Sequence, residues 1–108
     1  MSYDLQIDPQ EVKQRIDRGE SMVLLDVREP WEHEICRIAG SVLVPMAVLP
    51  SRLDWLEEKQ DVVVYCHMGM RSLNAAAWLR DQGVSGARSL AGGIARWTDE
   101  IDSSLARY

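Results

Sequence analysis

The segment that most constrains the fold is Val62–Tyr65, a run of four large apolar side chains. A strand that is apolar on both of its faces is typical of a parallel sheet covered by helices on both sides. A short loop follows, which begins with Cys66, contains Gly69 and closes with Arg71, and a helical pattern starts directly after it. This order predicts a buried parallel strand that leads through a tight loop into a helix.

Strand-like and helix-like patterns alternate along the rest of the chain, which is typical of an α/β fold. Asp8 and Pro9 are expected as the N-cap and first residue of the first helix, and Pro50 in the first turn of the third. The expected strands are 5–7, 22–27, 42–44, 62–65 and 88–90, and the expected helices are 9–19, 30–35, one within 49–58, 72–82 and one that keeps helical spacing from 94 to 105. We therefore predict one α/β domain over residues 1–108, with a central, mostly parallel sheet of about five strands and helices on both faces.

Cys66 stands where a nucleophile can form. Ligands of parallel sheets bind at the carboxyl ends of the strands, and the free N–H groups of the following helix point back at the loop. The positive end of the helix dipole favours a thiolate over a thiol, and a tight loop around Gly69 turns its amides inward as an anion-binding nest. The pattern predicts a reactive thiolate at Cys66. The alternative is a buried structural thiol, since free cysteine is among the most buried residue types.

The loop also carries a resemblance to a known family. Its Cys-x4-Arg pattern, with Cys66 first and Arg71 last, resembles the active-site loop of the rhodanese-like sulfurtransferases. Further stretches are similar to motifs of that family in the same order, namely Leu24–Pro30 with its Asp-x-Arg turn, Ile38–Ser41 followed by Val44–Pro45, and the Gly-Gly-x-x-x-Trp stretch Gly92–Trp97. The resemblance covers nearly the whole chain. Arg37 is a departure, because the family usually has a histidine before the isoleucine.

The resemblance implies a sulfurtransferase that works without a metal or an organic cofactor. Cys66 would accept sulfane sulfur from thiosulfate or another persulfide donor, carry it as a persulfide, and pass it to cyanide, a thiol or a protein. Asp26 and Arg28 are expected to support the loop from a neighbouring strand end. The residues expected to bind the substrate are His67, Met68, Gly69, Met70, Arg71 and Ser72.

Two other functions stay open at this stage. One is a persulfide carrier or interaction module that acts with a partner protein and has little activity on thiosulfate. The other is a phosphatase or arsenate reductase, although related phosphatases use the longer Cys-x5-Arg loop, which gives a tetrahedral phosphate a wider cradle.

Several side chains near the loop have more than one interpretation. Arg71 can anchor an anion or brace the loop. His67 is not required as a base, because a thiolate stabilised by amides needs none. Cys36 is interpreted as a half-buried packing residue, with a resolving thiol as the alternative. The glutamate pairs are interpreted as solvated faces and the tryptophans as core and rim packing; these residues are Glu32, Glu34, Glu57, Glu58, Trp31, Trp55, Trp78 and Trp97.

The composition limits which classes of partner and which cellular compartment are expected. The net charge of −5 and the lack of a basic stripe argue against nucleic acid as a partner. The same charge repels anionic donors at long range, so a thiosulfate site must rely on local positive groups. Two cysteines are too few for a disulfide framework, and with histidine they match no zinc module. The lack of a secretory signal or a membrane-length apolar run makes the cytoplasm the expected location, with no membrane partner.

Overall fold

The computed structural model, which describes residues 5–108, places β4 (Val62–Tyr65) inside a five-stranded sheet. The strand order is β1-β5-β4-β2-β3, and every neighbouring pair is parallel. The other strands are β1 (Gln6–Ile7), β2 (Val23–Asp26), β3 (Val42–Leu43) and β5 (Ala87–Leu90). The helices are α1 (Pro9–Asp17), α2 (Pro30–Ile35), α3 (Leu53–Lys59), α4 (Met70–Asp81) and α5 (Gly93–Glu100), with a 3-10 helix, η2, over Met46–Arg52. The predicted α/β class and parallel sheet are confirmed.

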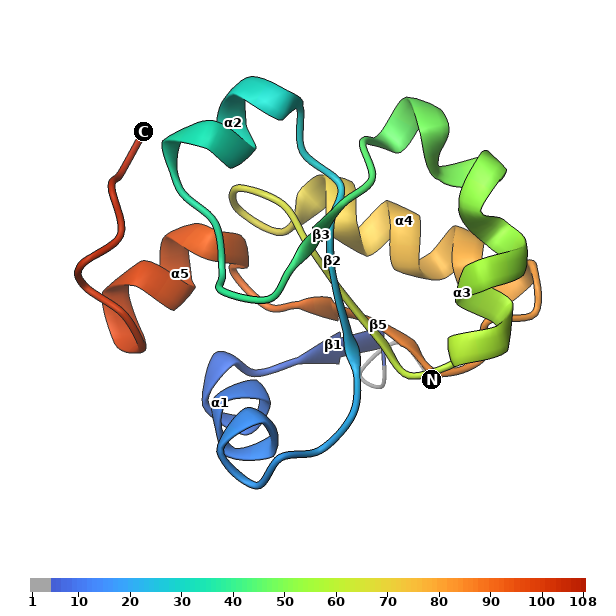
Figure 1. Cartoon of the computed structure of the whole chain (residues 1–108), viewed down its shortest axis with the longest axis horizontal. Helices are drawn as coiled ribbons and strands as arrows, with labels where there is room; N and C mark the ends of the chain where they lie inside the picture. Colours follow the sequence, from blue (N-terminus) through green and yellow to red (C-terminus); the bar gives the residue numbers. More distant parts are fainter. Residues whose placement is uncertain (1–4) are drawn as a thin grey trace.

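Helices cover both faces of the sheet, as Figure 1 shows. Val62 and Val64 of β4 belong to a core formed with α3 and α4, whereas Val63 and Tyr65 belong to a second core formed with α1 and α5. All four side chains are fully buried. The continuous apolar run of β4 therefore has its explanation: successive side chains point to opposite faces, and each face has a helical layer to bury them.

The expected place of Pro50 was wrong, whereas Asp8 and Pro9 are the N-cap and first residue of α1, as predicted. Pro50 lies inside η2, and the α-helix begins only at Leu53. A proline disfavours α geometry in the residue before it, which suits the 3-10 geometry at Leu49, and the surrounding packing sets where the α-helix begins. Asp8 has the extended N-cap backbone, yet its side chain makes no cap hydrogen bond. Its carboxylate lies instead 3.2 Å from a guanidinium nitrogen of Arg96 in α5.

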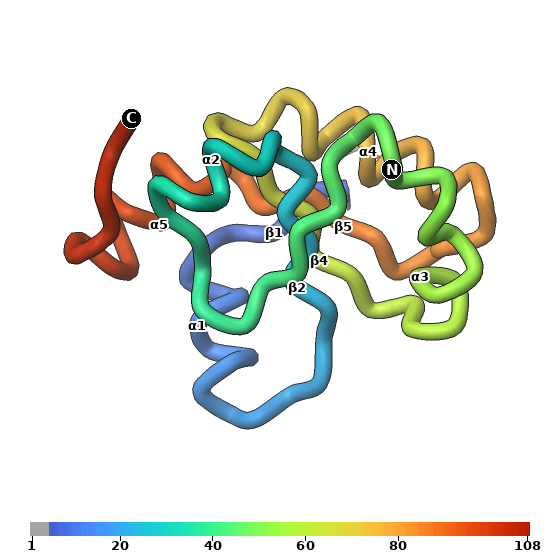
Figure 2. Tube along the Cα trace, turned by 45° about the horizontal axis from the view of Figure 1, so that its top comes forward, coloured from blue at the N-terminus to red at the C-terminus, as the bar shows by residue number. Residues whose placement is uncertain are grey.

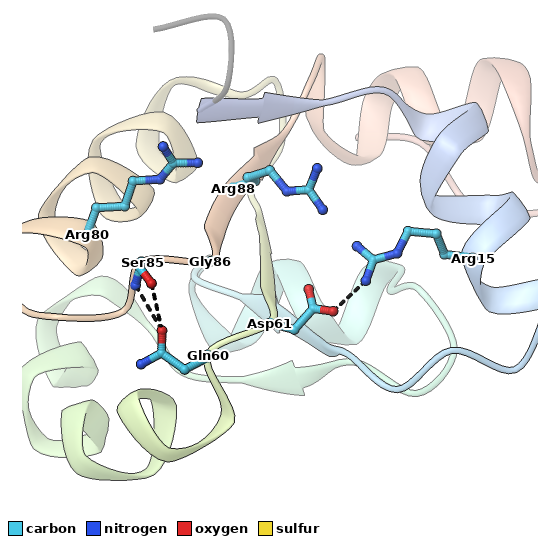
Figure 3. A pocket seen from close by; sticks show the side chains of 7 residues that line it. All are labelled: Arg15, Gln60, Asp61, Arg80, Ser85, Gly86 and Arg88. Atoms are coloured by element: carbon cyan, nitrogen blue, oxygen red, sulfur yellow. Dashed lines mark hydrogen bonds and ion pairs between the residues drawn. The ribbon is translucent and has the colours of Figure 1, made fainter. Parts of the chain in front are cut away.

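An arginine-lined pocket of about 370 Å³ lies at the amino-terminal edge of the sheet (Figure 3). Arg15 of α1 pairs there with Asp61, which precedes β4, and with Glu20 at 2.9 Å. Gln60 accepts hydrogen bonds from the amide and hydroxyl of Ser85, at 3.1 and 3.0 Å. The ion pairs and hydrogen bonds that line the pocket thus hold α1 and the turn before β5 against the start of β4.

The opposite, carboxyl-terminal edge carries the Cys66 loop. Figures 1 and 2 both show this loop beside α2 and the start of α5, which are far from it in sequence. Within residues 5–108, none of the helices is long and apolar enough to span a bilayer.

Candidate active site

Backbone amides converge on the sulfur of Cys66. The N–H of Gly69 donates to Sγ at 3.1 Å and the N–H of Ser72 donates to it at 3.4 Å. The Ser72 hydroxyl also lies 3.4 Å from Sγ. The residue is 1 % exposed, so these groups replace the water that would otherwise solvate the sulfur. Hydrogen bonds to a charged form favour that form, so this arrangement of donors is able to stabilise an anionic sulfur.

The loop can aim its amides because of Gly69, the N-cap of α4. Its φ of +108° lies in the region that residues with a Cβ rarely adopt. The turn at Gly69 lets α4 begin at Met70, so the amide of Ser72 lies in the first turn of the helix. That amide is one of the free donors at a helix N-terminus. The expected helix start near residue 71 or 72 was therefore one or two residues late.

The start of α5 holds the other side of the loop. Ile94 donates its N–H to the carbonyl of Cys66 at 2.9 Å, and Ala95 donates to the carbonyl of His67 at 3.0 Å. Gly93 makes this approach possible, because a Cβ there would lie 2.4 Å from the His67 oxygen and 2.6 Å from the Cys66 oxygen. The loop thus lies between two helix N-termini: α4 donates to the sulfur and α5 donates to the carbonyls.

Ser72 joins the loop to the sheet. Its hydroxyl lies 2.7 Å from the hydroxyl of Ser89 on β5 and 3.3 Å from the carbonyl of Gly69. Both serines are buried. The hydroxyl beside Sγ is therefore fixed in place by groups on either side of it.

Arg71 forms a two-pronged ion pair with Glu32 of α2. The two guanidinium nitrogens lie 2.7 and 2.8 Å from the two carboxylate oxygens. These hydrogen bonds, which outweigh the opposing effect of burial, lower the pKa of Glu32 to about 2 and raise the pKa of Arg71. Of the two interpretations of Arg71, the observed contacts match a brace for the loop.

The interpretation of Glu32 as a solvated residue was wrong. Glu32 is 3 % exposed and occupies the third position of α2, where its carboxylate also accepts the Glu29 N–H at 3.0 Å. Together, Glu29 and Glu32 form a capping box around Pro30, the first residue of the helix. The spacing of Pro30 at the first helical position and Glu32 in the first turn is a readable helix-start signal. That spacing gave no sign that the same carboxylate meets Arg71, because the two residues are 39 positions apart.

Asp26 and Arg28 form a second, fully buried ion pair at the end of β2. The guanidinium lies 2.8 Å from each carboxylate oxygen and donates to the carbonyl of Cys36 at 2.6 Å. Burial disfavours the Asp26 carboxylate, but hydrogen bonds from Arg28 and His33 outweigh it and lower the pKa of Asp26. The side chains of this pair contact the carboxyl-terminal end of α2, through His33 and Cys36, and Arg28 also contacts the rings of Tyr65 and Tyr108. Its support of the loop is therefore indirect and runs through α2 and through Tyr65, the residue before Cys66.

His67 and Cys36 lie beside the loop. The imidazole of His67 stacks on the ring of Tyr108, with centroids 4.0 Å apart, and within residues 5–108 no hydrogen bond joins it to Cys66. Cys36 ends α2, is more buried than expected at 7 % exposed, and places its Sγ 3.9 Å from Arg28. Both cysteines are free thiols. Arg37, at the family's usual histidine position, is exposed, with one guanidinium nitrogen 3.5 Å from the His33 carbonyl.

Replacing Glu32 tests the brace through its pH dependence. The folded pKa of about 2 lies below the ordinary 4.5, so the ionised form stabilises the fold above pH 4.5 and this contribution is lost as the pH falls toward 2. Because Arg71 is 40 % exposed, we expect Glu32→Gln to lower the free energy of unfolding by only about 1–3 kcal/mol at neutral pH. Urea unfolding across this pH range should show the difference shrinking as the pH falls. An equal difference at every pH would contradict the electrostatic role.

Replacing Gly93 tests the close approach of α5. A Cβ there meets two carbonyl oxygens, so we expect Gly93→Ala to destabilise the fold by more than about 2 kcal/mol. Gly19→Ala is the matched control, because Gly19 also has a positive φ, of +73°, but has open space around it. That control should cost about 1 kcal/mol. Equal losses of stability in the two variants would show that the contact between Gly93 and the loop carbonyls makes no contribution of its own.

The family comparison agrees with this architecture. The rhodanese-like domain family matches residues 8–100. A solved structure of a rhodanese-like domain protein from Staphylococcus aureus superposes with a TM-score of 0.81 at 25 % identity, covering 95 % of this chain and 97 % of that one.

Curated relatives are similar over most of the chain. A sulfurtransferase from Allochromatium vinosum is 36 % identical, covering 85 % of this chain and 86 % of the relative. The putative sulfur carrier protein YrkF from Bacillus subtilis is 34 % identical over 83 % of this chain and 49 % of its own length. The probable adenylyltransferase/sulfurtransferase MoeZ from Mycobacterium tuberculosis is 35 % identical over 94 % of this chain, which spans only 26 % of that relative. The chain described here belongs to the rhodanese-like domain family, and sulfurtransferases and a sulfur carrier are among its relatives.

Proposed function

We propose that the chain, over residues 1–108, is a sulfurtransferase domain in which the Cys66 thiolate accepts sulfane sulfur from thiosulfate or another persulfide donor. The observation that carries this proposal is the pair of amides, from Gly69 and Ser72, that donate to Sγ. An anionic sulfur is what such donors stabilise. The relatives named as sulfurtransferases support the same chemistry.

The reaction needs only this loop and the two substrates. The thiolate attacks the outer sulfur of thiosulfate, a new S–S bond forms, and the old S–S bond breaks with its electron pair leaving on sulfite. Cys66 then carries a persulfide. A thiophilic acceptor attacks the terminal sulfur, and the electron pair of that bond returns to Sγ. No proton has to move in the first step, which is why His67 can stay stacked on Tyr108 while the chemistry proceeds.

Local donors have to overcome the charge of the whole chain. The net charge of −5 repels thiosulfate at long range, and Glu32 neutralises much of the charge on Arg71. None of the described contacts of the Cys66 sulfur involves a carboxylate that would offset the amides at the start of α4. We therefore assign anion stabilisation mainly to Gly69 and Ser72, and assign to Arg71 the task of holding the loop in the shape that points them inward.

A persulfide carrier that works with a partner protein is the second candidate. Met68 and Met70 flank Gly69 in the loop, and their side chains are 68 % and 71 % exposed. Trp31 of α2 is 58 % exposed. Large apolar side chains in water beside a reactive group are typical of a surface that a protein covers. The similarity to a putative sulfur carrier protein favours the same candidate. In this case the acceptor is a protein thiol and turnover with cyanide is slow.

Mass spectrometry of the intact protein tests the role of Cys66 in both candidates. After treatment with thiosulfate, or with a persulfide donor, we expect the wild-type mass to rise by one sulfur atom and to fall again after cyanide is added. Cys66→Ser should gain no sulfur, because an alcohol is a poor nucleophile at neutral pH and forms no persulfide. Cys36→Ser is the matched control and should gain sulfur like the wild type. A Cys66→Ser variant that still gains cyanide-labile sulfur would refute the assignment.

Substitutions of Arg71 test the brace by activity. Arg71→Ala removes both hydrogen bonds to Glu32, and we expect sulfur transfer from thiosulfate to fall by about 10- to 100-fold, the worth of a charged hydrogen-bonded pair. Arg71→Lys should recover only part of this loss, because a point charge does not reproduce the planar fork. The double variant Arg71→Ala/Glu32→Gln should be no worse than Arg71→Ala. Additive losses would show that Arg71 acts on the substrate independently of Glu32.

A further inference from the structure

Tyr108 connects the end of the described chain to the candidate site, although it lies outside the matched range of residues 8–100. Its hydroxyl donates to Oε2 of Glu32 at 2.7 Å and accepts from Nη1 of Arg28 at 2.9 Å. Its ring stacks on the imidazole of His67 with an interplanar angle of 16°. Trp31 of α2 meets the same ring edge-on, with centroids 5.9 Å apart. One side chain therefore contacts both ion pairs and the loop.

The hydroxyl acts on the Arg71 side of the loop. Oε2 of Glu32 receives hydrogen bonds from Tyr108 and from Arg71, so the two donors share one acceptor atom. Arg28 approaches the same hydroxyl from the other side, and burial contributes most to a Tyr108 pKa of about 12. At neutral pH the hydroxyl is thus a fixed donor. It limits how far the Glu32 carboxylate, and with it Arg71, can move.

The ring acts on the other side of the loop. His67 directly follows Cys66, and its imidazole lies flat against Tyr108. His67, Tyr108 and Cys36 line a cavity of about 150 Å³ beside the loop. With the Tyr108 ring in place, one face of the His67 imidazole is covered. Without the ring, that cavity would open into free space and the imidazole could swing away from the loop.

We propose that Tyr108 is a positioning residue for the Cys66 loop, which its hydroxyl fixes through Glu32 and Arg71 and its ring fixes through His67. This inference rests on the proposed role of Cys66 as the thiolate that accepts sulfur. It assigns separate roles to the hydroxyl and to the ring of Tyr108. The hydroxyl sets the charge environment that an anionic substrate meets, and the ring restricts access to Cys66 from the side of His67.

Alkylation of Cys66 separates these parts without requiring sulfur transfer. Tyr108→Phe, Tyr108→Ala and the control Arg107→Ala are made in a Cys36→Ala background, so that Cys66 is the only thiol. Arg107 is the preceding residue and forms an exposed ion pair with Asp99. The rates of reaction with neutral iodoacetamide and with anionic iodoacetate are measured at one pH, alongside kcat and KM for thiosulfate and the melting temperature.

The two substitutions should differ. Tyr108→Phe should leave the iodoacetamide rate near that of the parent but lower the iodoacetate-to-iodoacetamide ratio by about 2- to 10-fold, and raise KM for thiosulfate to a similar extent, because Glu32 loses a donor and its charge is less compensated. Tyr108→Ala should lower the ratio equally and also raise the iodoacetamide rate, because the ring is gone. Arg107→Ala should match the parent in every measurement, since an exposed ion pair has little weight.

Each other outcome overturns a stated part of the proposal. A ratio and KM unchanged in Tyr108→Phe would refute the role of the hydroxyl. An iodoacetamide rate in Tyr108→Ala no higher than in Tyr108→Phe would refute the role of the ring. Equal changes in Arg107→Ala would assign the effect to the order of the whole terminal segment. If the parent itself transfers no sulfur, the proposed function fails, whereas the alkylation rates still decide the role of Tyr108.

Discussion

The candidate site depends on one interaction, the donation of loop amides to a buried sulfur. Backbone N–H groups carry only partial charges, so they stabilise an anion only when several of them point at it from fixed positions. At Cys66 the positions are fixed by a strand end, a glycine turn and the first turn of α4. The sheet supplies the strand end because β4 lies between β2 and β5 and is buried on both faces. A central strand is less free to shift than an edge strand, so the Cys66 loop that follows β4 starts from a fixed position.

The two ion pairs, of which Asp26–Arg28 is fully buried and Glu32–Arg71 is partly exposed, have a common role in positioning α2. Removing charges from water is costly, and a buried ion pair is often no better for stability than apolar packing. Glu32–Arg71 joins α2 to the start of α4, and Asp26–Arg28 joins the end of β2 to Cys36 at the end of α2, so together they hold α2 against the carboxyl edge of the sheet. Apolar contacts are non-directional, whereas a two-pronged guanidinium–carboxylate pair fixes both distance and plane. A loop whose amides must point at one atom gains from that precision, even where net stability does not.

The sequence predicted the parts of this site that are local in the chain. The apolar run of β4, the glycine in the loop and the helix after it lie within about a dozen residues, and they indicate the anion nest through backbone geometry alone. The partners that come from elsewhere did not show in the pattern. Glu32 reads as a surface residue because helix periodicity does not reveal which face meets a loop 39 residues away. Tyr108 and Ser89 belong to no motif. Ser89 reaches the site because β5 lies beside β4 in the sheet, and Tyr108 reaches it because the chain after α5 returns to α2. Pro50 illustrates the limit at the local level, since proline permits either a helix start or a 3-10 turn and the surrounding packing decides between them.

The burial of Cys66 also bears on how the proposed site would meet either a small sulfur donor or a protein partner. The side chain is 1 % exposed, so a bulky acceptor has little access to Sγ itself. A persulfide adds one atom beyond Sγ, on the side from which the first donor came, and that terminal sulfur is the atom an acceptor must attack. The side chains of Met68 and Met70 extend into water from the same loop, on either side of Gly69. In the proposed carrier, a protein acceptor would contact these exposed side chains as it reaches the terminal sulfur. For the two proposed functions, the expected difference between enzyme and carrier therefore lies in these exposed side chains, because the amides would perform the same task in both.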